Sequence, residues 1–525
     1  MAKEVRFKLP FDQDVDEHIG KEYLNKSQGN SYQIMSRSLD ARGANRGKKP
    51  CFHYRVLLDY DESIEVEKFP QIKPFEKPPI IVGAGPAGLF AALRFQEFGI
   101  PTIILERGDN THERMKKIGR YWRYGEFDAD NNVCYGEGGA GLFSDGKLIT
   151  RVKSPYVKYV MKKLVELGAP KEILYDSNPH VGSNKIRQLI KNISEYLKQN
   201  GHQIILNQRV TELIFNEDKT KVTGVKTIEG KEYHSDEVLL AVGHSARSMY
   251  QHLHENKVEL KAKDFSIGVR IEHPRSQIDK FQFGDYASDP RLGAARYRLS
   301  WHDQSNDRGC YSFCMCPGGY VLSSGTREDH LVVNGMSNYG CNSRWSNSAI
   351  VVSIKNGIDF NQDQKNLLEG IDFQAKVESD AFQLSQERAS GKEVPYQRMI
   401  DFLDGSSKAD EVKPKNSVPS GIFHYPLFDL LPEQVNNQLH KAFKEFDKNM
   451  PGYISKDALL FAPETRTSSP VTIVRDPKSL ESVSHSGLYP LGEGAGYAGG
   501  ITSAAVDGIK AVMAILEAKK LYVTS

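Results

Sequence analysis

The chain has 525 residues, of which 39% are hydrophobic and 26% charged, the usage of a globular rather than a disordered protein. Lys and Arg together number 69 against 67 Asp and Glu, so the net charge of +2 gives no electrostatic case for a nucleic-acid partner. No run of roughly 18 apolar residues predicts a membrane span, and the first residues lack the apolar segment of a secretory signal. Six cysteines are too few for a disulfide scaffold. We therefore expect a cytoplasmic protein of roughly two to four domains, without integral membrane association.

Residues 1–75 are predicted to form a small α+β domain. Its expected elements are strands at Val5–Leu9, Tyr32–Leu39 and Phe52–Asp59 and a helix at Val15–Leu24. The basic, Gly-rich segment Ala41–Pro50 between the last two strands fits either a solvated turn or an RNA contact. Because acidic and basic side chains are nearly equal in number over this domain, we expect no nucleic acid here. A Pro-containing linker, Phe69–Pro79, follows.

The strongest motif in the chain is Ile80-Ile-Val-Gly-Ala-Gly-Pro-Ala-Gly88. Its pattern G-x-G-x-x-G is weak evidence alone, because it recurs at Gly136–Gly141 and Gly494–Gly499. Only the first copy follows a short apolar strand and opens an amphipathic helix. A second strand, Thr102–Leu105, then ends in Glu106, near the roughly 20-residue spacing that a dinucleotide-binding βαβ unit requires. This context predicts such a unit.

Each residue type in that unit has a physical role. Gly83 permits the tight turn, Gly85 lets the backbone approach a pyrophosphate, and Gly88 lets the helix pack closely on the strand. The helix N-terminus offers unpaired N–H groups to the diphosphate. Glu106 is expected to accept hydrogen bonds from the adenosine ribose, and its charge would repel the 2′-phosphate of NADP. The alternative is a Gly-rich turn without a ligand.

The far end of the chain favours FAD over NAD. The segment Gly487–Lys510 resembles the second flavoprotein fingerprint, with an apolar strand, a Gly-rich turn and a long helix. Glu493 stands where most flavoproteins place Asp, and the helix opens at Gly500 and Ile501, whose N–H groups would face the flavin. The alternative is a strand-turn-helix used only for packing. The intervening pieces resemble a glutathione-reductase-type FAD fold, in which the backbone of Val210 meets adenine and Gly243 closes the cofactor domain.

Longer blocks resemble the bacterial FAD-dependent dehydrogenases, also described as NAD(FAD)-utilising dehydrogenases. The resemblance runs through nearly the whole chain. The similar blocks are Ser38–Arg42, Asn132–Lys147, Phe313–Tyr320, Asn334–Ser337, Asn347–Ala349 and Glu464–Pro470. The resemblance implies a fold and a cofactor, but no substrate.

The chain departs from the disulfide reductases that share this FAD fold. It lacks their redox C-x-x-x-x-C after the second strand, where Cys134 stands alone. It also lacks a second complete βαβ unit for a nicotinamide nucleotide. NAD(P)H as a transient electron donor therefore stays an open alternative.

Three sets of residues are candidates for chemistry. The small residues Gly138–Gly141, followed by Ser144 and Lys147, would let a flat isoalloxazine lie against backbone, unless they form a structural loop. Cys314 and Cys316 share one face of an extended segment, which favours packing over a flavin-proximal thiol; without a fourth ligand they predict no metal site. Arg466 would clamp a substrate carboxylate or the cofactor diphosphate, or form an ordinary salt bridge.

These patterns predict an α/β protein with a doubly wound, Rossmann-like FAD-binding domain that is discontinuous in sequence. The expected divisions are a small α+β domain at 1–75, the first part of the FAD domain at 76–250 with a helical insertion at about 153–182, a mixed α/β substrate domain at 251–454, and the second part of the FAD domain at 455–525. The candidate cofactor-binding residues are Gly83, Gly85, Pro86, Ala87, Gly88, Glu106, Arg107, Gly138, Gly139, Ala140, Gly141, Ser144, Lys147, Val210, Gly243, Gly492, Glu493, Gly500 and Ile501.

The function that these residues favour is an FAD-dependent oxidoreductase passing a hydride between a small-molecule substrate and flavin N5. One alternative is an RNA-modifying flavoenzyme, against which the even charge balance argues. The other is a flavin-binding sensor or scaffold without turnover. The residues leave the substrate, the catalytic acid or base and the oligomeric state open.

Overall fold

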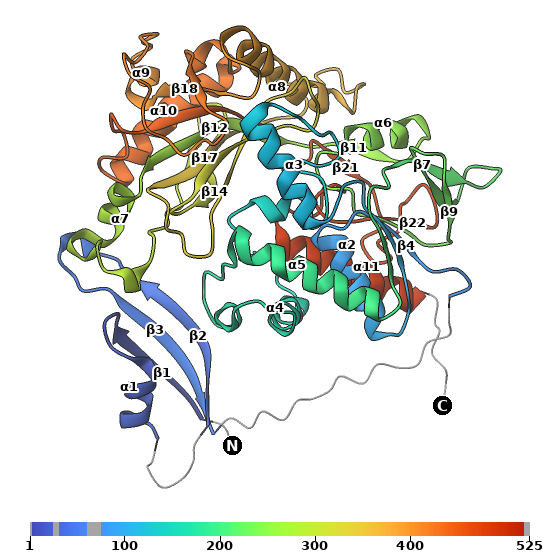
Figure 1. Ribbon diagram of the computed structural model, residues 1–525, viewed down its shortest axis with the longest axis horizontal. Helices are drawn as coiled ribbons and strands as arrows, with labels where there is room; N and C mark the ends of the chain where they lie inside the picture. The colour runs from blue at the N-terminus through green and yellow to red at the C-terminus, as the bar shows by residue number, and fades with distance from the viewer. Residues whose placement is uncertain (1–2, 25–30, 60–74, 519–525) are drawn as a thin grey trace.

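The computed structural model describes residues 3–24, 31–59 and 75–518. Most of the predicted linker Phe69–Pro79 lies outside these ranges. Apolar spacing also predicts a C-terminal helix over Ser503–Lys520, and its last two residues lie outside them as well. Figure 1 shows three parts: a small N-terminal sheet, a parallel sheet flanked by helices, and a larger mixed sheet. Together they make a mixed α/β fold, which confirms that class.

The N-terminal segment has the predicted β-α-β-β order, and the domain boundaries of the chain stay a prediction. Its elements are β1 (Lys3–Pro10), α1 (Val15–Glu22), β2 (Tyr32–Asp40) and β3 (Cys51–Leu58), and the sheet order β1-β3-β2 is antiparallel. The Asp14 carboxylate caps α1 by accepting from the Glu17 N–H, which satisfies one of the unpaired donors at a helix start. Ile19 of α1 packs on Leu9 and Val56 of the sheet, which gives the domain its own small core.

A five-stranded parallel sheet forms the second part of the molecule, with the order β22-β10-β4-β5-β6. Its strands are β4 (Ile80–Val82), β5 (Ile103–Leu105), β6 (Gln203–Ile205), β10 (Val238–Leu240) and β22 (Leu488–Pro490). The sheet joins the start, the middle and the end of the chain, because β10 pairs with β4 on one side and β22 on the other. The FAD-type motifs near both ends of the sequence therefore meet at one sheet.

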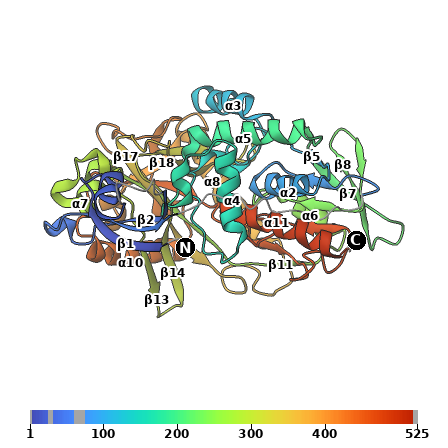
Figure 2. The ribbon, with the colours of Figure 1, turned by 90° about the horizontal axis from the view of Figure 1, so that it is seen from below.

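Helices cover one face of this sheet. They are α2 (Pro86–Glu97), α4 (Tyr156–Glu166), α5 (Gly182–Gln199) and α11 (Ile501–Ala518), and both views place α2, α5 and α11 side by side (Figures 1 and 2). Ile81 and Leu239 face this helical layer, whereas Ile80 and Val82 face the opposite side, as alternation along a strand requires. The apolar spacing of Ser154–Gly168 and Asn184–Gly201 predicts two helices, and α4 and α5 lie at these positions.

The opposite face packs on a second, antiparallel sheet. Its strands are β7 (Val210–Phe215), β8 (Val222–Thr227) and β9 (Glu232–His234), and α6 (Arg247–Glu255) packs beside them. The sequence predicts a meander of strands at Gln203–Leu206, Val210–Phe215, Lys221–Glu229 and Val238–Val242. The middle two correspond to β7 and β8, whereas the first and last belong to the parallel sheet as β6 and β10, and β9 was not predicted. A doubly wound sheet has helices on both faces, whereas strands cover most of the second face here. The doubly wound arrangement therefore stays a prediction.

A seven-stranded sheet forms the third part, with the order β13-β14-β17-β12-β20-β18-β19. Its strands are β12 (Phe265–Pro274), β13 (Ser300–Asp303), β14 (Arg308–Cys316), β17 (Trp345–Ile354), β18 (Val394–Arg398), β19 (Ile422–His424) and β20 (Leu459–Glu464). The remaining elements are α3 (Thr111–Tyr124), α7 (Arg275–Phe283), α8 (Glu369–Arg388), α9 (Met399–Leu403), α10 (Glu433–Asn449), β11 (Leu260–Ala262), β15 (Tyr320–Ser324), β16 (Val332–Met336) and β21 (Val471–Ile473). Helix α10 packs on this sheet through Leu439 and Phe443.

The N-terminal domain contacts both larger parts. Arg37 of β2 pairs with Asp176 through Nε–Oδ1 and Nη2–Oδ2 distances of 2.6 and 2.9 Å, and its backbone bonds to Tyr175 and Ser177. Phe11 belongs to the core of the seven-stranded sheet, which also includes Ile278 and Phe283 of α7. Within the described ranges, no helix has the length and apolar character to cross a bilayer. The cytoplasmic location stays a prediction.

Candidate functional site

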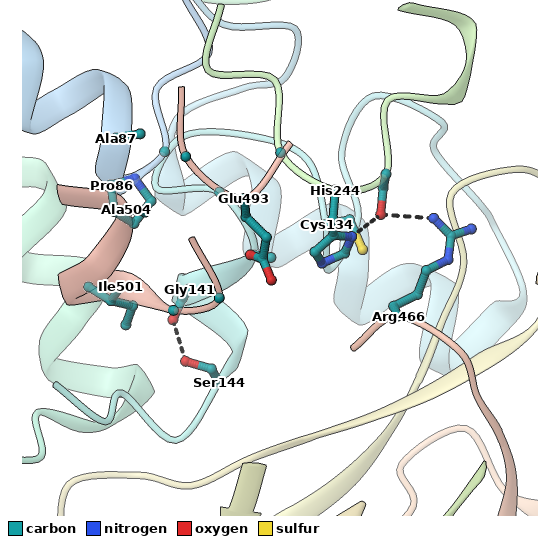
Figure 3. Close-up of a pocket in the computed structure, with 18 of the residues that line it drawn as sticks. Pro86, Ala87, Cys134, Gly141, Ser144, His244, Arg466, Glu493, Ile501 and Ala504 are labelled. Carbon is teal, nitrogen blue, oxygen red and sulfur yellow. Dashed lines mark hydrogen bonds between the residues drawn. The ribbon is translucent and has the colours of Figure 1, made fainter. Parts of the chain in front are cut away.

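A cavity of about 1310 Å³ lies between the parallel sheet and the seven-stranded sheet (Figure 3). Val82, Leu105 and Ala241 line it at the carboxyl ends of β4, β5 and β10, and Cys314 and Glu464 line it from β14 and β20. The carboxyl edge of a parallel sheet is where ligands bind in open α/β folds, since the loops there are free to vary. The cavity is therefore the candidate site.

The turn between β4 and α2 is built as the glycine spacing predicts. Gly83 has φ +105°, and a Cβ there would lie 2.4 Å from the Ala241 carbonyl oxygen. A Cβ on Gly88 would lie 2.1 Å from the Gly83 oxygen, so this glycine allows helix and strand to touch. Gly85 is different, because its nearest neighbour is the Cα of Gly139 at 3.9 Å and it faces the cavity. No side chain caps α2, so its first N–H groups are available to an anion.

Glu106 lies at the end of β5 and is only 5% exposed, although it lines the cavity. Its carboxylate accepts backbone N–H groups from Ala84 at 2.9 Å, Gly108 at 3.0 Å and Gly136 at 3.1 Å. A carboxylate has about four acceptor positions, so these three bonds leave roughly one for a ligand. The sequence pattern predicts that this carboxylate accepts hydrogen bonds from the adenosine ribose. The structure adds a second role, in which Glu106 ties three loops together.

The C-terminal turn, where β22 leads to α11, lies beside the first turn, since a Cβ on Gly492 would lie 3.0 Å from the Ala87 Cβ. Gly492 donates its N–H to Asp507 at 2.8 Å, and Asp507 is itself paired with Arg475 at 2.6 Å. The Glu493 side chain points into the cavity (Figure 3). Burial raises the pKa of Glu493 to about 7, although the nearby Lys263 ammonium acts in the opposite direction. A carboxyl with this pKa changes charge near neutral pH.

The segment Gly138–Gly141 lies between the two turns. The Gly138 N–H donates to the Ala84 carbonyl at 2.9 Å, and a Cβ on Gly139 would lie 3.2 Å from the Cα of Gly85. Ser144 donates to the Gly141 carbonyl at 2.8 Å (Figure 3). This segment therefore contacts the first turn through backbone alone, as small residues permit.

Lys147 connects this segment to the seven-stranded sheet. Its ammonium donates to the Met315 carbonyl in β14 and lies 3.8 Å from the Asp145 carboxylate. Both Lys147 and Asp145 line the cavity. The Lys147 ammonium therefore lies where the seven-stranded sheet meets the part of the molecule that contains the parallel sheet.

Cys314 and Cys316 differ in their surroundings. Pairing between β14 and β17 is irregular from Phe313 to Cys316, and Cys314 has φ +45°. Cys314 lines the cavity, whereas Cys316 is fully buried and its thiol donates to the Cys314 carbonyl at 3.3 Å. A hydrogen bond from Cys316, and the Arg270 and Lys147 cations, lower the pKa of the Cys314 thiol. Cys316 is therefore a packed core residue. Cys314, which lines the cavity, stays the candidate for a thiol near the flavin.

Arg466 forms a buried salt bridge. Its guanidinium makes a bidentate pair with Glu378, with Nε–Oε1 and Nη2–Oε2 distances of 2.7 and 2.6 Å, and it also donates to Ser245 at 2.8 Å. Against the effect of burial, Arg466 and Arg247 hold the pKa of Glu378 well below its usual range. Arg466 therefore forms a salt bridge rather than a clamp for a substrate carboxylate or diphosphate, because its guanidinium fork is already occupied.

His244, like Arg466, lines the cavity. Ser245 stands between it and Arg466, with its hydroxyl 2.7 Å from His244 Nδ1 (Figure 3). Burial lowers the pKa of His244 to about 4, and the Arg466 charge acts in the same direction. The imidazole is therefore neutral at neutral pH.

The comparisons with known proteins agree with an FAD site. Residues 264–467 match the family described as FAD-dependent protein, C-terminal domain-like. An uncharacterized protein of Clostridium beijerinckii (strain ATCC 51743 / NCIMB 8052) is 39% identical over 511 residues, which cover 94% of each chain. The chain belongs to this family of FAD-dependent proteins. It is therefore an FAD-dependent flavoprotein.

Solved structures similar to this flavoprotein are distant. A flavocytochrome c3 fumarate reductase is 13% identical with a TM-score of 0.36, over 86% of this chain and 79% of that one. CtdE in complex with FAD is 13% identical with a TM-score of 0.30, over 85% and 84% of the two chains. Values this low carry no argument about the activity or substrate of this flavoprotein.

The structure brings nearly all of the predicted cofactor residues of this flavoprotein to one cavity. Those that line it are Gly83, Gly85, Pro86, Ala87, Glu106, Arg107, Gly139, Ala140, Gly141, Ser144, Lys147, Val210, Gly243, Gly492, Glu493, Gly500 and Ile501. Gly88 and Gly138 do not line it, because each packs against neighbouring backbone or a side chain.

Several lining residues had no signal in the sequence. Residues 296–300 and residues 311–315 of β14 line the cavity as well, with Arg296, Arg298 and Tyr311 among them. Asp507 accepts the Gly492 N–H from within α11, a helix whose sequence is mostly apolar. These side chains reach the site through tertiary packing rather than through a local motif.

Proposed function

We propose that this flavoprotein is an oxidoreductase of the FAD-dependent dehydrogenase type, which exchanges a hydride between a small-molecule substrate and N5 of the flavin. One observation carries the proposal. A single cavity runs from the β4–α2 turn and Glu106, past Glu493, to the side chains of β14. A dinucleotide needs both a diphosphate-binding turn and a separate wall for its reactive ring, and this cavity offers both.

The residues present fit FAD at the adenosine and diphosphate end. Gly85 leaves open space where any side chain would enter the cavity, and the uncapped N-terminus of α2 faces it. Glu106 keeps one acceptor position for a ribose hydroxyl. Val210 and Gly243 also line the cavity. When bound, FAD supplies two-electron exchange at N5, and the protein supplies binding and orientation.

The other end of the cavity carries two charged side chains and an aromatic surface for a substrate to contact. Glu493 and Lys147 both line the cavity there, and Lys147 is fixed by its bond to the Met315 carbonyl. A fixed cation stabilises negative charge that develops on a bound ring. Tyr311 and Phe313 of β14 provide an aromatic surface beside it. A small substrate would lie between this wall and the ring.

Two measurements test the proposal. Purified protein is denatured and the released flavin is separated by chromatography, where we expect FAD at about one equivalent per chain. Anaerobic reduction of the bound flavin is then followed spectroscopically with NADH, NADPH and a panel of alcohols, amines and acids. Release of FMN would overturn the cofactor assignment. Slow reduction by every donor would instead favour a flavin-binding sensor.

A further inference from the structure

The extended segment just before β13 has two different faces. Tyr297 and Leu299 belong to the core of the seven-stranded sheet. Arg296 is half-buried and Arg298 is exposed, and both line the cavity. Because successive side chains of an extended chain point to opposite sides, the two arginines face away from that core. Two positive charges therefore lie on the cavity side of the segment.

Backbone pairing places one of these arginines beside an aromatic side chain. The Ser312 N–H donates to the Leu299 carbonyl at 2.8 Å, and the Leu299 N–H donates to the Ser312 hydroxyl at 2.8 Å. These bonds extend the antiparallel pairing of β13 with β14 by one residue. The next residues along the two strands, Arg298 and Phe313, therefore lie opposite each other, and residues in that relation share one face of a sheet.

Phe313 offers an apolar surface that the protein does not cover. It is half-buried and lines the cavity, and among the residues that the structure describes it is in no hydrophobic core and no aromatic pair. Ile149, which is 40% exposed, lines the same cavity. Lys147 bonds to the Met315 carbonyl two residues further along β14, so Phe313 lies at the end of the cavity proposed for the flavin ring. An apolar group bound there would remove this surface from water.

Arg298 differs from most other arginines of the cavity in having no partner. The paired ones are Arg107 and Arg209 with Asp130, Arg296 with Asp145, and Arg466 with Glu378. Within the described ranges, Arg298 has no hydrogen bond or ion pair, and the same holds for Arg151 in the loop after Lys147. A guanidinium keeps its charge at any physiological pH. The donors of Arg298 are therefore open to an anion that enters the cavity.

The surroundings of Arg298 also favour an anion. Arg296 and Lys147 lie 3.1 and 3.8 Å from the single carboxylate of Asp145, so two cations already face one anion. Glu493 lines the cavity too, but burial raises its pKa to about 7, which leaves it only partly ionised at neutral pH. The charges at this end therefore have an excess of cations. A positive potential inside a cavity attracts anionic ligands.

We propose that the substrate is a carboxylic acid, whose carboxylate binds Arg298 and whose apolar part lies against Phe313. This inference rests on the proposed function, because it names the substrate class of that oxidoreductase. A guanidinium presents two parallel N–H donors to the two oxygens of a carboxylate, and both bonds are charge-assisted. Arg466 does not take this role, since Glu378 occupies its fork. Held at both its acid end and its apolar end, the substrate has one orientation against the wall of the cavity.

Benzoate is the test probe, because it carries a carboxylate on an apolar ring, and benzamide is its uncharged counterpart of nearly the same shape. The FAD-loaded protein is titrated with each compound, and binding is followed by calorimetry and by the change in the flavin absorption spectrum. We expect saturable binding of benzoate. Benzamide should bind about tenfold more weakly or worse, because it lacks the charge-assisted pair of bonds.

Substitutions of Arg298 test the assignment to one residue. Arg298→Gln should weaken benzoate binding about tenfold or more and leave benzamide binding nearly unchanged. Arg298→Lys should keep part of the affinity, since it retains the charge but loses the fork. Arg291→Gln is the matched control without effect, because Arg291 pairs with Asp289 and does not line the cavity. Arg298 has no partner to lose in the described part of the chain, so we expect its variants to fold and to retain FAD.

The possible outcomes separate this inference from the proposed function. Absence of saturable benzoate binding, equal binding of benzoate and benzamide, or equal benzoate affinity in Arg298→Gln and the unsubstituted protein would each overturn the inference. Tighter binding of phenyl phosphate than of benzoate would overturn the carboxylate class in favour of a phosphate ester. The flavin content of each sample is measured after denaturation. Protein without FAD would contradict the proposed function, whereas FAD-loaded protein that fails these titrations would contradict only the inference about Arg298.

Discussion

Arg270 of β12 and Glu464 of β20 form a bidentate ion pair at the wall of the cavity. Arg270 is fully buried, and its Nε and Nη2 lie 2.8 and 3.0 Å from the two carboxylate oxygens. A further Arg270 N–H reaches the Asn347 side chain at 2.9 Å. The pair therefore joins three adjacent strands, β17, β12 and β20, next to the place where β14 faces the cavity.

Arg270→Met should destabilise the protein strongly, because Glu464 is left buried without its partner. Breaking one side of such a pair costs about 3–5 kcal/mol. The measurement is urea unfolding of the FAD-loaded protein. In the double variant Arg270→Met, Glu464→Leu we expect part of that loss to be recovered, since no charge remains buried. A double variant less stable than the single one would contradict this account.

Glu106→Gln should weaken FAD retention about tenfold or more. The substitution puts an amide NH₂ toward backbone N–H donors and loses at least one charge-assisted bond, worth roughly 1.5–3 kcal/mol. Retention is measured by equilibrium dialysis of the flavin. The flavin absorption spectrum should barely change, because this residue lies at the adenosine end of the proposed site.

Glu493→Gln should instead shift the flavin reduction potential to more positive values. Removing a negative charge near the ring favours its reduced, more negative state, and about 1.4 kcal/mol corresponds to about 30 mV for a two-electron couple. Dye equilibration measures the potential, with Glu106→Gln as the matched carboxylate control. If Glu106→Gln moved the potential and Glu493→Gln did not, the two ends of the cofactor would have to be exchanged.

Gly83→Ala and Gly85→Ala should separate folding from binding. Alanine at Gly83 would need φ +105° with its Cβ 2.4 Å from a carbonyl oxygen, so we expect a loss of at least about 1–2 kcal/mol in thermal or urea unfolding. At Gly85 the φ of −81° suits any residue, and the nearest neighbour is 3.9 Å away. There the apo-protein should keep its stability but lose FAD affinity. Equal FAD affinity in Gly85→Ala and the unsubstituted protein would count against the diphosphate placement.

Glu272 should make stability depend on pH. It is fully buried in β12, Ser417 donates both its N–H and its hydroxyl to it, and burial raises its pKa to about 8. The native state therefore holds a proton that the unfolded state releases at about 4.5, so stability falls as pH rises from about 4.5 to 8. Urea unfolding at pH 5, 7 and 8.5 measures this slope. Glu272→Gln should flatten it, and an equal slope in both proteins would refute the assignment.

The local geometry of the glycine turn between β4 and α2 could be predicted from the sequence. The spacing of Gly83, Gly85 and Gly88 indicated a strand, a tight turn and a helix, and β4 and α2 have that geometry. Glu106 was assigned to ribose binding, yet its bonds to Ala84 and two other backbone N–H groups became visible only with the loops in place. Backbone donors carry no sequence signature, so such a second role cannot be read from residue types.

What the sequence alone determined is local. Glycine spacing, apolar alternation and helix ends indicated the parallel strands, the helices and the two turns that meet at the cavity, because backbone sterics and burial act over a few residues. Tertiary structure decided which distant groups meet. Asp145, His180 and Cys341 lie far apart in the chain, as do Arg466 and its partner Glu378. Their contacts depend on how strands and loops pack in three dimensions, and no single stretch of residues encodes that packing.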